Sequence, residues 1–325
     1  MSSVKVAVVG ATGAVGETIV RVLGERRVPI GDLGRFASRQ RDGVEAVTPE
    51  RLREYDVVFF ASSEDASEAY APAIVERGAV VIDNSSAYRT LAGIPLVIPE
   101  VNASEVRPEH RLFPIANCTA IILCMALAPV RDVAGLRRVR VASYQAASGA
   151  GRAGLDELLA AERAVALGEP EPGAAVFPRV LARNVVPQVG AFDDSGYCGE
   201  ERKVAEETRK MLGLPSLRVS ATAVRVPVRT AHSEAVWFET ERDTNIEELV
   251  TAFERAPGIV FHREGIITPR DVEGTDDVHV ARLRSEEADS RREFVLWCVG
   301  DQLRKGAATN GVQILELLLE RGFVG

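Results

Sequence analysis

A cysteine at the predicted start of a helix is the residue of this chain best suited to covalent chemistry. Cys118 stands in the segment Asn117-Cys118-Thr119, which precedes the apolar run 120–130. At a helix N-terminus the dipole favours a thiolate, and a thiolate is the nucleophile that attacks a carbonyl carbon. The alternative, a buried structural cysteine, suits Cys124 and Cys298 better, because both lie inside apolar segments. We therefore expect Cys118 to be a catalytic nucleophile.

Other polar side chains stand at predicted strand ends, where they can work with such a nucleophile. Gln145 ends a strand in a glycine-rich turn and could orient a substrate through its amide. Arg225 and His232 stand at a strand end and in the loop after it. A guanidinium can hold a carboxylate with its planar fork, and an imidazole can serve as acid and base for the thiol. Taken singly, each is equally well explained as a turn or surface residue, as is Arg89 after an earlier strand.

Three glycines near the N-terminus predict a phosphate-binding loop. Gly10, Gly13 and Gly16 follow the β-branched run 4–9 and open a segment with helical spacing. Without Cβ atoms the backbone can turn tightly and approach a pyrophosphate, which the N–H groups of the helix N-terminus then bind. The spacing is Gly-x-x-Gly-x-x-Gly rather than the commoner Gly-x-Gly-x-x-Gly, so a tight turn without a ligand is the alternative. The strand–loop–helix context favours dinucleotide binding.

The segment after the second strand bears on the choice of cofactor. A ribose 2′-hydroxyl requires an acidic residue there, whereas a 2′-phosphate requires a cation. Ser38, Arg39 and Arg41 stand in this segment and favour NADP, while Asp42 leaves NAD possible. A solvated surface loop is the alternative.

The elements that must position these residues form an α/β pattern. In the first part of the chain, short apolar strands at 4–9, 56–61 and 79–83 alternate with helices, one of them near 65–77. This alternation predicts βαβ units on a parallel sheet. After residue 130 the predicted strands alternate apolar and polar residues, which is typical of a sheet with one covered face. These strands are expected at 137–145, 217–225, 233–241, 278–283 and 293–299, with helices near 155–167, 200–212 and 245–255 and a closing helix at 303–320.

The composition excludes several classes of protein. A length of 325 residues suggests about two domains. The formal net charge of −8 argues against a nucleic-acid partner, and the longest apolar run, 118–130, is shorter than the roughly 20 residues of a membrane span. The first residues do not form a secretory signal. The four cysteines lack disulfide or metal-site spacing, so we expect no metal site and a cytoplasmic protein with reduced thiols.

Several segments, in order, resemble the bacterial aspartate-β-semialdehyde dehydrogenase family nearly end to end. The matching segments are Val-Val-Gly-Ala-Thr-Gly-Ala-Val-Gly at 8–16, Val-Ile-Asp-Asn-Ser-Ser-Ala-Tyr-Arg at 81–89, Pro-Glu-Val-Asn at 99–102, Asn-Cys-Thr at 117–119, Tyr-Gln-Ala-Ala-Ser-Gly-Ala-Gly at 144–151, Asn-Val-Val-Pro-Gln at 184–188, Ser-Ala-Thr-Ala-Val-Arg-Val-Pro-Val at 220–228 and Leu-Arg-Lys-Gly-Ala-Ala-Thr-Asn at 303–310.

The resemblance implies an α/β fold with two domains. It implies a Rossmann-type NADP-binding domain at 1–117, completed by a C-terminal helix at 303–325, and an α+β catalytic and dimerisation domain at 118–302 that resembles the C-terminal domain of glyceraldehyde-3-phosphate dehydrogenase. It also implies NADP-dependent, reversible reductive dephosphorylation of L-aspartyl-4-phosphate to L-aspartate 4-semialdehyde. This reaction belongs to lysine, threonine, methionine and diaminopimelate biosynthesis. The implied assembly is a homodimer or homotetramer formed through the central sheet.

The resemblance also implies a role for each residue of the site. Cys118 would be the nucleophile, His232 the acid and base, and Gln145 the residue that orients the thioester. The substrate would be bound by Arg225 at its α-carboxylate, Glu200 at its ammonium group, and Arg89, Lys203 and Asn117 at its phosphate. The cofactor would be bound by Gly10, Thr12, Gly13, Ala14, Val15, Gly16, Ser38, Arg39, Arg41, Ser148, Gly149 and Asn310.

The chain departs from the family pattern at two loops. Ile115-Ala116 replaces an Asn-Pro pair before Asn117-Cys118, and the acidic segment 61–65 replaces a Ser-Ala-Gly-Gly loop near the cofactor. These departures leave a cofactor-binding paralogue without catalysis as one alternative. A related phosphorylating reductase that uses the same thioester chemistry, such as N-acetyl-glutamyl-phosphate reductase, is the other.

Overall fold

A computed structural model describes residues 3–288 and 290–324 of the chain. These residues form two compact units, one made of the described residues of 1–117 and 307–325 and the other of those of 118–306. The expected division places the second boundary after Gln302, whereas residues 303–306 here belong to the second unit. Residues 1, 2 and 325 of the expected first domain lie outside the described residues.

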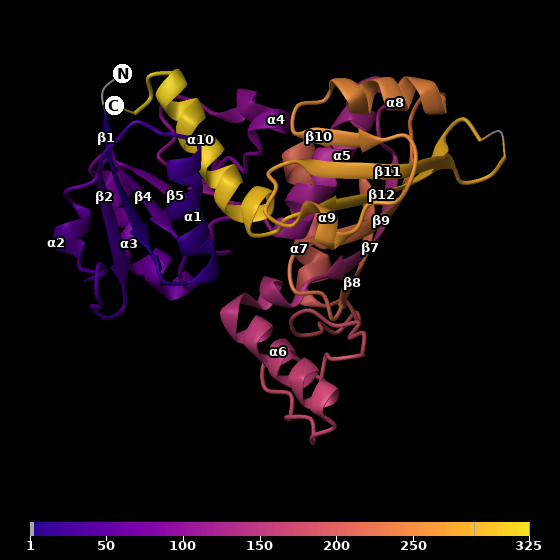
Figure 1. Cartoon of the computed structure of the whole chain (residues 1–325). Helices are drawn as coiled ribbons and strands as arrows, with labels where there is room; N and C mark the ends of the chain where they lie inside the picture. Colours follow the sequence, from indigo (N-terminus) through magenta and orange to yellow (C-terminus); the bar gives the residue numbers. More distant parts are fainter. Residues whose placement is uncertain (1–2, 289, 325) are drawn as a thin grey trace. The chain divides into compact units, whose positions relative to one another are not determined.

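The first unit is built on a parallel sheet with strand order β3-β2-β1-β4-β5-β6 (Figure 1). This is the doubly wound order, in which ligands bind outside the carboxyl ends of the strands where the order reverses, here between β1 and β4. The strands are β1 Val4–Val9, β2 Ile30–Ala37, β3 Glu45–Ala46, β4 Val57–Phe60, β5 Val80–Asp83 and β6 Leu112–Pro114. The helices are α1 Ala14–Glu25, α2 Pro49–Leu52, α3 Glu64–Glu76, α4 Pro99–Asn102 and α10 Thr309–Glu320, with a 3₁₀ turn at Ala103–Glu105.

The C-terminal helix α10 belongs to this first unit. The guanidinium of Arg26, at the end of α1, donates hydrogen bonds to both carboxylate oxygens of Glu316 on α10, the shortest being 2.7 Å. Asn310 and Gln313 donate from the same helix to the Val97 carbonyl and to the Glu100 carboxylate. Helix α10 therefore completes the Rossmann-type layer although it lies far from the rest of that layer in sequence (Figure 1).

The second unit is built on a mixed sheet with strand order β10-β11-β12-β9-β7-β8. Only β7–β8 and β10–β11 among the neighbouring pairs of this sheet are parallel. Its strands are β7 Arg138–Gln145, β8 Arg218–Arg225, β9 His232–Glu239, β10 Ile259–His262, β11 Val278–Ser285 and β12 Glu293–Gly300. Its helices are α5 Cys118–Ala134, α6 Gly151–Leu167, α7 Gly199–Leu212, α8 Ile246–Arg255 and α9 Pro269–Val272, with a 3₁₀ turn at Ala147–Ala150 and a π-helical turn at Arg304–Ala308.

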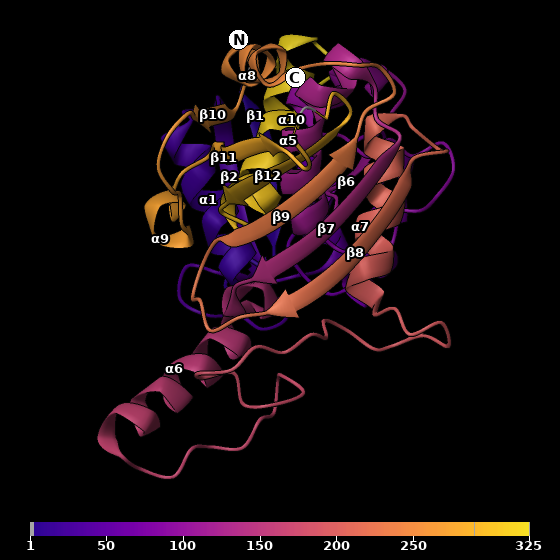
Figure 2. The same ribbon diagram turned by 90° about the vertical axis from the view of Figure 1, so that its right-hand side faces the viewer.

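Alternation along the strands of the second sheet separates a covered face from a more open one. Along β7, Val139, Val141, Ser143 and Gln145 are buried, and this face lies against helices α5, α7 and α8. On the other face, Tyr144 is 36% exposed and its ring contacts Trp297 of β12. Helix α6 extends away from the end of the sheet at which β7 and β8 finish (Figure 2). The expected α/β class, with a parallel-sheet domain and an α+β domain, is confirmed.

Two expectations about local structure were wrong. His232 was expected in a loop but is the first residue of β9, because it pairs with Gly300 at the end of β12. The closing helix was expected from residue 303, but residues 304–308 form a π-helical turn and the α-helix begins at Thr309. The Asp301 carboxylate accepts hydrogen bonds from the N–H groups of Leu303 and Arg304, and it thereby fixes this turn.

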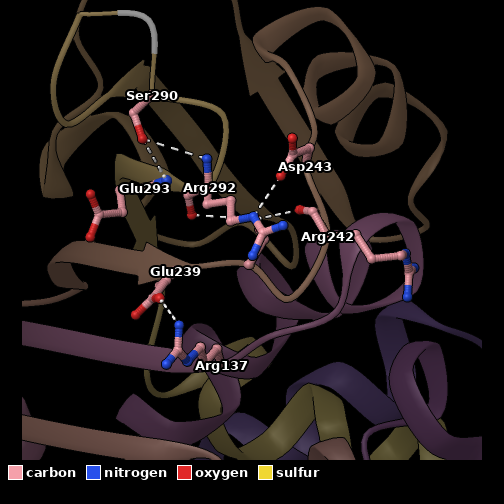
Figure 3. Close-up of polar contacts among 8 residues, drawn as sticks. Arg137, Glu239, Arg242, Asp243, Ser290, Arg292 and Glu293 are labelled. Atoms are coloured by element: carbon pink, nitrogen blue, oxygen red, sulfur yellow. Dashed lines mark hydrogen bonds and ion pairs between the residues drawn. The ribbon is translucent and has the colours of Figure 1, made fainter.

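The end of the second sheet at which β7 begins carries surface ion pairs (Figure 3). Arg137 donates to the Glu239 carboxylate at 2.7 Å, and Arg292 donates to Asp243. The Ser290 hydroxyl accepts from the backbone at the start of β12. Because β7 and β9 are antiparallel, the end of β7 and the start of β9 meet at the opposite end of the sheet, where the candidate catalytic residues lie.

Candidate active site

Cys118 is the first residue of α5, as the sequence predicts. Its side chain is half-buried, whereas Cys124, Cys198 and Cys298 are buried. Burial raises the pKa of the Cys124 and Cys298 thiols, which suits a structural role. A Cβ atom added to Gly306 would lie only 2.9 Å from the Cβ of Cys118, so the π-helical turn packs closely against this cysteine.

Gln145, the last residue of β7, links three elements of the second unit. Its side chain is 1% exposed, and its Nε2 donates to Thr119 Oγ1 on α5 at 3.0 Å. The same nitrogen donates to Glu200 Oε1 on α7 at 3.0 Å. An ionised carboxylate only accepts hydrogen bonds, so the orientation of the amide is fixed by Glu200. Gln145 therefore joins the neighbour of Cys118 to the predicted ammonium-binding residue.

Arg225, the last residue of β8, places a cation in the same group. It is 5% exposed, and its Nη1 donates to the Ala146 carbonyl at 2.7 Å. Burial lowers its pKa, while the nearby groups of Glu200 and Cys118 raise it. A guanidinium and a helix N-terminus both favour negative charge at the sulfur. The arrangement can thus hold a thiolate beside a cation that is also suited to a carboxylate.

His232 is fully buried at the start of β9. The Ala146 N–H donates to its Nδ1 at 3.1 Å, while its Nε2 has no hydrogen-bond partner among the described residues. Desolvation, and then the charge of Arg225, hold the pKa of the imidazole well below its usual range, so the ring is neutral. A neutral ring that accepts at Nδ1 carries its proton at Nε2. A Cβ added to Gly149 would lie 3.1 Å from Nε2 and 2.6 Å from Nη1 of Arg225, so this turn borders both residues.

The second unit thus brings together five of the predicted residues, namely Cys118, Gln145, Glu200, Arg225 and His232. Lys203 is exposed on α7, three residues after Glu200, so both can reach one ligand from the same helix face. Ser148 is 4% exposed, and its hydroxyl accepts from Gln302, which the sequence did not single out. A glutamine shortly after a strand gives no local signal of such a contact.

The glycine loop of the first unit has the geometry that a pyrophosphate requires. Gly10 has φ +83°, and a Cβ there would lie 2.2 Å from the Ala61 carbonyl oxygen. A Cβ on Gly16 would lie 2.1 Å from the Gly10 carbonyl oxygen, and Gly13 caps α1 without a side chain. The loop therefore presents bare backbone at a helix N-terminus. This geometry fits the phosphates of a dinucleotide.

The segment after β2 lies beside that loop. The Phe36 carbonyl accepts from the N–H groups of Gly10 and Ala11 at 2.8 and 3.0 Å. Ser38 and Arg39 follow directly and are exposed. Arg41 is also exposed and pairs with Val44 in a tight turn. Two cations thus stand where the second strand ends.

The acidic loop 61–65 has a structural explanation. Ser63 caps α3, accepting from the Ala66 N–H, so Glu64 and Asp65 lie in the first turn of that helix. Carboxylates are stabilised at this end of the helix dipole. The Glu64 carboxylate also accepts a hydrogen bond from the Ser86 hydroxyl.

The remaining predicted residues lie in the first unit. Arg89 donates through Nη2 to the Asn84 carbonyl at 3.0 Å in the turn after β5. Asn117 is 7% exposed directly before α5. Asn310 is fully buried, and its amide nitrogen donates to the Val97 carbonyl at 2.8 Å. Their roles toward substrate and cofactor remain predictions, as does a cofactor role for Thr12, Ala14 and Val15.

Comparisons with known proteins identify the class. A profile described as "Semialdehyde dehydrogenase, NAD binding domain" matches residues 5–108, and one described as "Semialdehyde dehydrogenase, dimerisation domain" matches residues 127–305. Part of the chain is thus a nicotinamide-cofactor domain of the semialdehyde dehydrogenases. Aspartate-semialdehyde dehydrogenase of Aquifex aeolicus is 38% identical over 98% of this chain and 99% of the relative. Aspartate-semialdehyde dehydrogenase 2 of Vibrio cholerae is 40% identical over 98% of each chain.

Solved structures agree with this assignment. The aspartate semialdehyde dehydrogenase II of Vibrio cholerae, described as complexed with ASA, has a TM-score of 0.93 at 38% identity and covers 98% of this chain and 99% of its own. The Candida albicans enzyme with NADP has a TM-score of 0.78 at 22% identity over 99% of this chain and 100% of its own, which shows the fold alone. The chain belongs to the aspartate-semialdehyde dehydrogenase family, and it is an oxidoreductase of amino-acid biosynthesis. The described residues include no helix with the length and apolarity needed to cross a membrane.

Proposed function

We propose that the chain catalyses the reversible, NADP-dependent conversion of L-aspartyl-4-phosphate to L-aspartate 4-semialdehyde and phosphate. The observation that carries this proposal is the convergence of Gln145, Glu200, Arg225 and His232 on the start of the helix that begins with Cys118. A carboxylate and a buried guanidinium together suit the ammonium and carboxylate groups of an amino acid. The same pair argues against N-acetyl-glutamyl-phosphate reductase, whose substrate has no free ammonium group.

The steps follow from these groups. The Cys118 sulfur attacks the acyl carbon, a C–S bond forms, and the C–O bond to phosphate breaks. By the family resemblance, Lys203, Arg89 and Asn117 would receive the leaving phosphate, while Gln145 would orient the thioester. The nicotinamide, when bound, supplies the hydride. The thiohemiacetal then loses the sulfur and yields the aldehyde.

His232 controls the proton at the substrate oxygen. In its neutral form the Nε2–H can donate a hydrogen bond to the developing oxyanion. Because Nδ1 already accepts from Ala146, we infer that Arg225 and the helix N-terminus, rather than the imidazole, favour the Cys118 thiolate before substrate arrives. In the oxidation direction the neutral ring, in the tautomer with its proton on Nδ1, takes the thiohemiacetal proton at Nε2, and in the reduction direction the imidazolium returns that proton.

The cofactor and the assembly are part of the proposal. Gly10, Gly13 and Gly16 would hold the pyrophosphate, and Ser38, Arg39 and Arg41 would bind the 2′-phosphate of NADP, with NAD as the weaker cofactor. The open face of the second sheet, with Tyr144 and Trp297, would form the homodimer or homotetramer contact. The chain would function in the cytoplasm, where its four free cysteines stay reduced.

The test is phosphate-dependent reduction of NADP by the purified protein with aspartate semialdehyde. NAD and N-acetylglutamate semialdehyde are assayed in parallel, together with Cys118→Ala. We expect turnover with aspartate semialdehyde that is lost in the variant, and selective alkylation of Cys118 over Cys124. A folded wild type that binds NADP without turnover, and whose Cys118 is no more reactive than Cys124, would instead support a non-catalytic paralogue.

A further inference from the structure

Gln302 is a buried side chain that follows β12 and bonds to two loops of the second unit. Its Oε1 accepts the Ala231 N–H at 2.8 Å, and its Nε2 donates to Ser148 Oγ at 2.6 Å. The side chain is 2% exposed, so solvent cannot replace these bonds. Ala231 directly precedes His232, and Ser148 directly precedes Gly149. The Gln302 amide thus binds the residues that directly precede His232 and Gly149.

Ala231 needs such a restraint. It has φ +67°, in the left-handed region that a non-glycine residue rarely adopts, and it is fully buried. Its carbonyl raises the pKa of the His232 imidazole. The Ala231 peptide therefore influences both the position of the ring and its ability to hold a second proton.

The turn that contains Ser148 is held on two sides. The N–H groups of Ala147 and Ser148 donate to the carbonyls of Val228 and Arg229 at 2.8 and 3.1 Å, which ties the turn to the β8–β9 loop. Gln302 ties the same turn to the segment after β12. Gly149, at this turn, borders Nε2 of His232 and Nη1 of Arg225.

We propose that Gln302 is a positioning residue of the reaction, and that its amide holds Ala231 and Ser148 so that His232 and the Gly149 turn keep their places beside Cys118. This role rests on the proposed function, because it acts through His232.

The first test is Gln302→Met, which keeps nearly the same length and removes both hydrogen bonds. Misplacement of a catalytic group by about 1 Å can cost about 100-fold in rate, so we expect kcat to fall on that order. KM for aspartate semialdehyde should change little, because Glu200 and Arg225 are untouched. In the phosphate-dependent oxidation, the acidic limb of the kcat profile should move to lower pH. The Ala231 carbonyl raises the pKa of His232 and would lose its place, while Arg225, the charged group that acts on the ring, stays.

Gln302→Glu is the conservative partner of this variant. A protonated carboxyl can accept from the Ala231 N–H and donate to Ser148 Oγ as the amide does, so most of kcat should return. The acidic limb should return toward its wild-type position as well.

Gln313→Met is the matched control in the first unit, since it removes a 2.7 Å amide hydrogen bond to Glu100. It should leave the pH profile unshifted. A Gln302→Met enzyme with kcat within about threefold of wild type, or with a lower kcat but an unshifted acidic limb, would overturn the proposal.

If the proposed function fails, the positioning role of Gln302 can still be tested by a measurement that needs no turnover. If the wild type shows no turnover, the His232 ring is followed by ¹⁵N NMR of histidine-labelled protein, assigned with His232→Asn. We expect Gln302→Met to change the nitrogen shifts and lower the pKa of His232. Identical titration of His232 in wild type and Gln302→Met would refute the positioning role of Gln302.

Discussion

Glu234→Gln should change the pH dependence of folding of the second unit. Glu234 is fully buried on β9, between Ser143 of β7 and Cys298 of β12. Its Oε2 accepts from the Cys298 thiol at 3.6 Å, and its Oε1 has no partner among the described residues. Desolvation raises the pKa of this carboxyl well above 4.5, so the folded state keeps the acid protonated.

The direction in which stability changes with pH follows from the number of protons that the folded and unfolded chains bind. Above pH 4.5 the unfolded chain releases the Glu234 proton while the folded chain retains it, so stability falls as pH rises toward the folded-state pKa. The cost is about 1.4 kcal/mol for each pH unit between the unfolded-state and folded-state pKa values. Glutamine has no proton to retain, but its NH₂ group would be buried without an acceptor at about 1–3 kcal/mol. Glu234→Gln should therefore be less stable than wild type near pH 4.5, and this difference should shrink and then reverse as the pH rises.

Tryptophan fluorescence during urea unfolding is the assay. Trp237 and Trp297 are the chain's 2 tryptophans, and both lie in the second unit, on β9 and β12. The stability difference between variant and wild type should rise by about 1.4 kcal/mol per pH unit from pH 5 to pH 7. Glu239→Gln, on the same strand and ion-paired with Arg137, should lower stability by at most about 1 kcal/mol without that slope. Parallel pH curves for wild type and Glu234→Gln would refute the reasoning.

Three further predictions concern the ligands. Arg225→Lys should raise KM for aspartate semialdehyde by at least about 10-fold in steady-state kinetics, because an ammonium group lacks the two-pronged fork; an unchanged KM would remove Arg225 from carboxylate binding. Arg39→Ala with Arg41→Ala should raise KM for NADP about 10- to 100-fold and leave KM for NAD within about twofold, and equal changes for both cofactors would contradict 2′-phosphate binding. Gly16→Ala should abolish NADP binding in calorimetry, since its Cβ would lie 2.1 Å from the Gly10 carbonyl oxygen, and wild-type affinity would show that the loop does not cradle the pyrophosphate.

Local sequence patterns predicted the secondary structure correctly where one segment contains all the residues that define its element. The β-branched run before Gly10, the glycine spacing and the helix after it predict a strand, a tight turn and a helix. The apolar run after Cys118 likewise predicts the helix that begins at this residue. The start of the last helix was placed too early, because the Asp301 carboxylate binds the next N–H groups and the chain turns before Thr309.

The sequence by itself predicted the parallel-sheet domain, the glycine loop and the cysteine at the start of a helix, because each depends on neighbours within about one helical turn or one strand. Only the tertiary structure decided which residues share a site. Gln145 reaches Glu200 across 55 positions, and Gln302 reaches Ser148 across 154. Such contacts depend on strand order and register, which bring the end of β7 to the start of β9 and the end of β12. Burial then sets the charge of His232 and Glu234, and no local pattern encodes it.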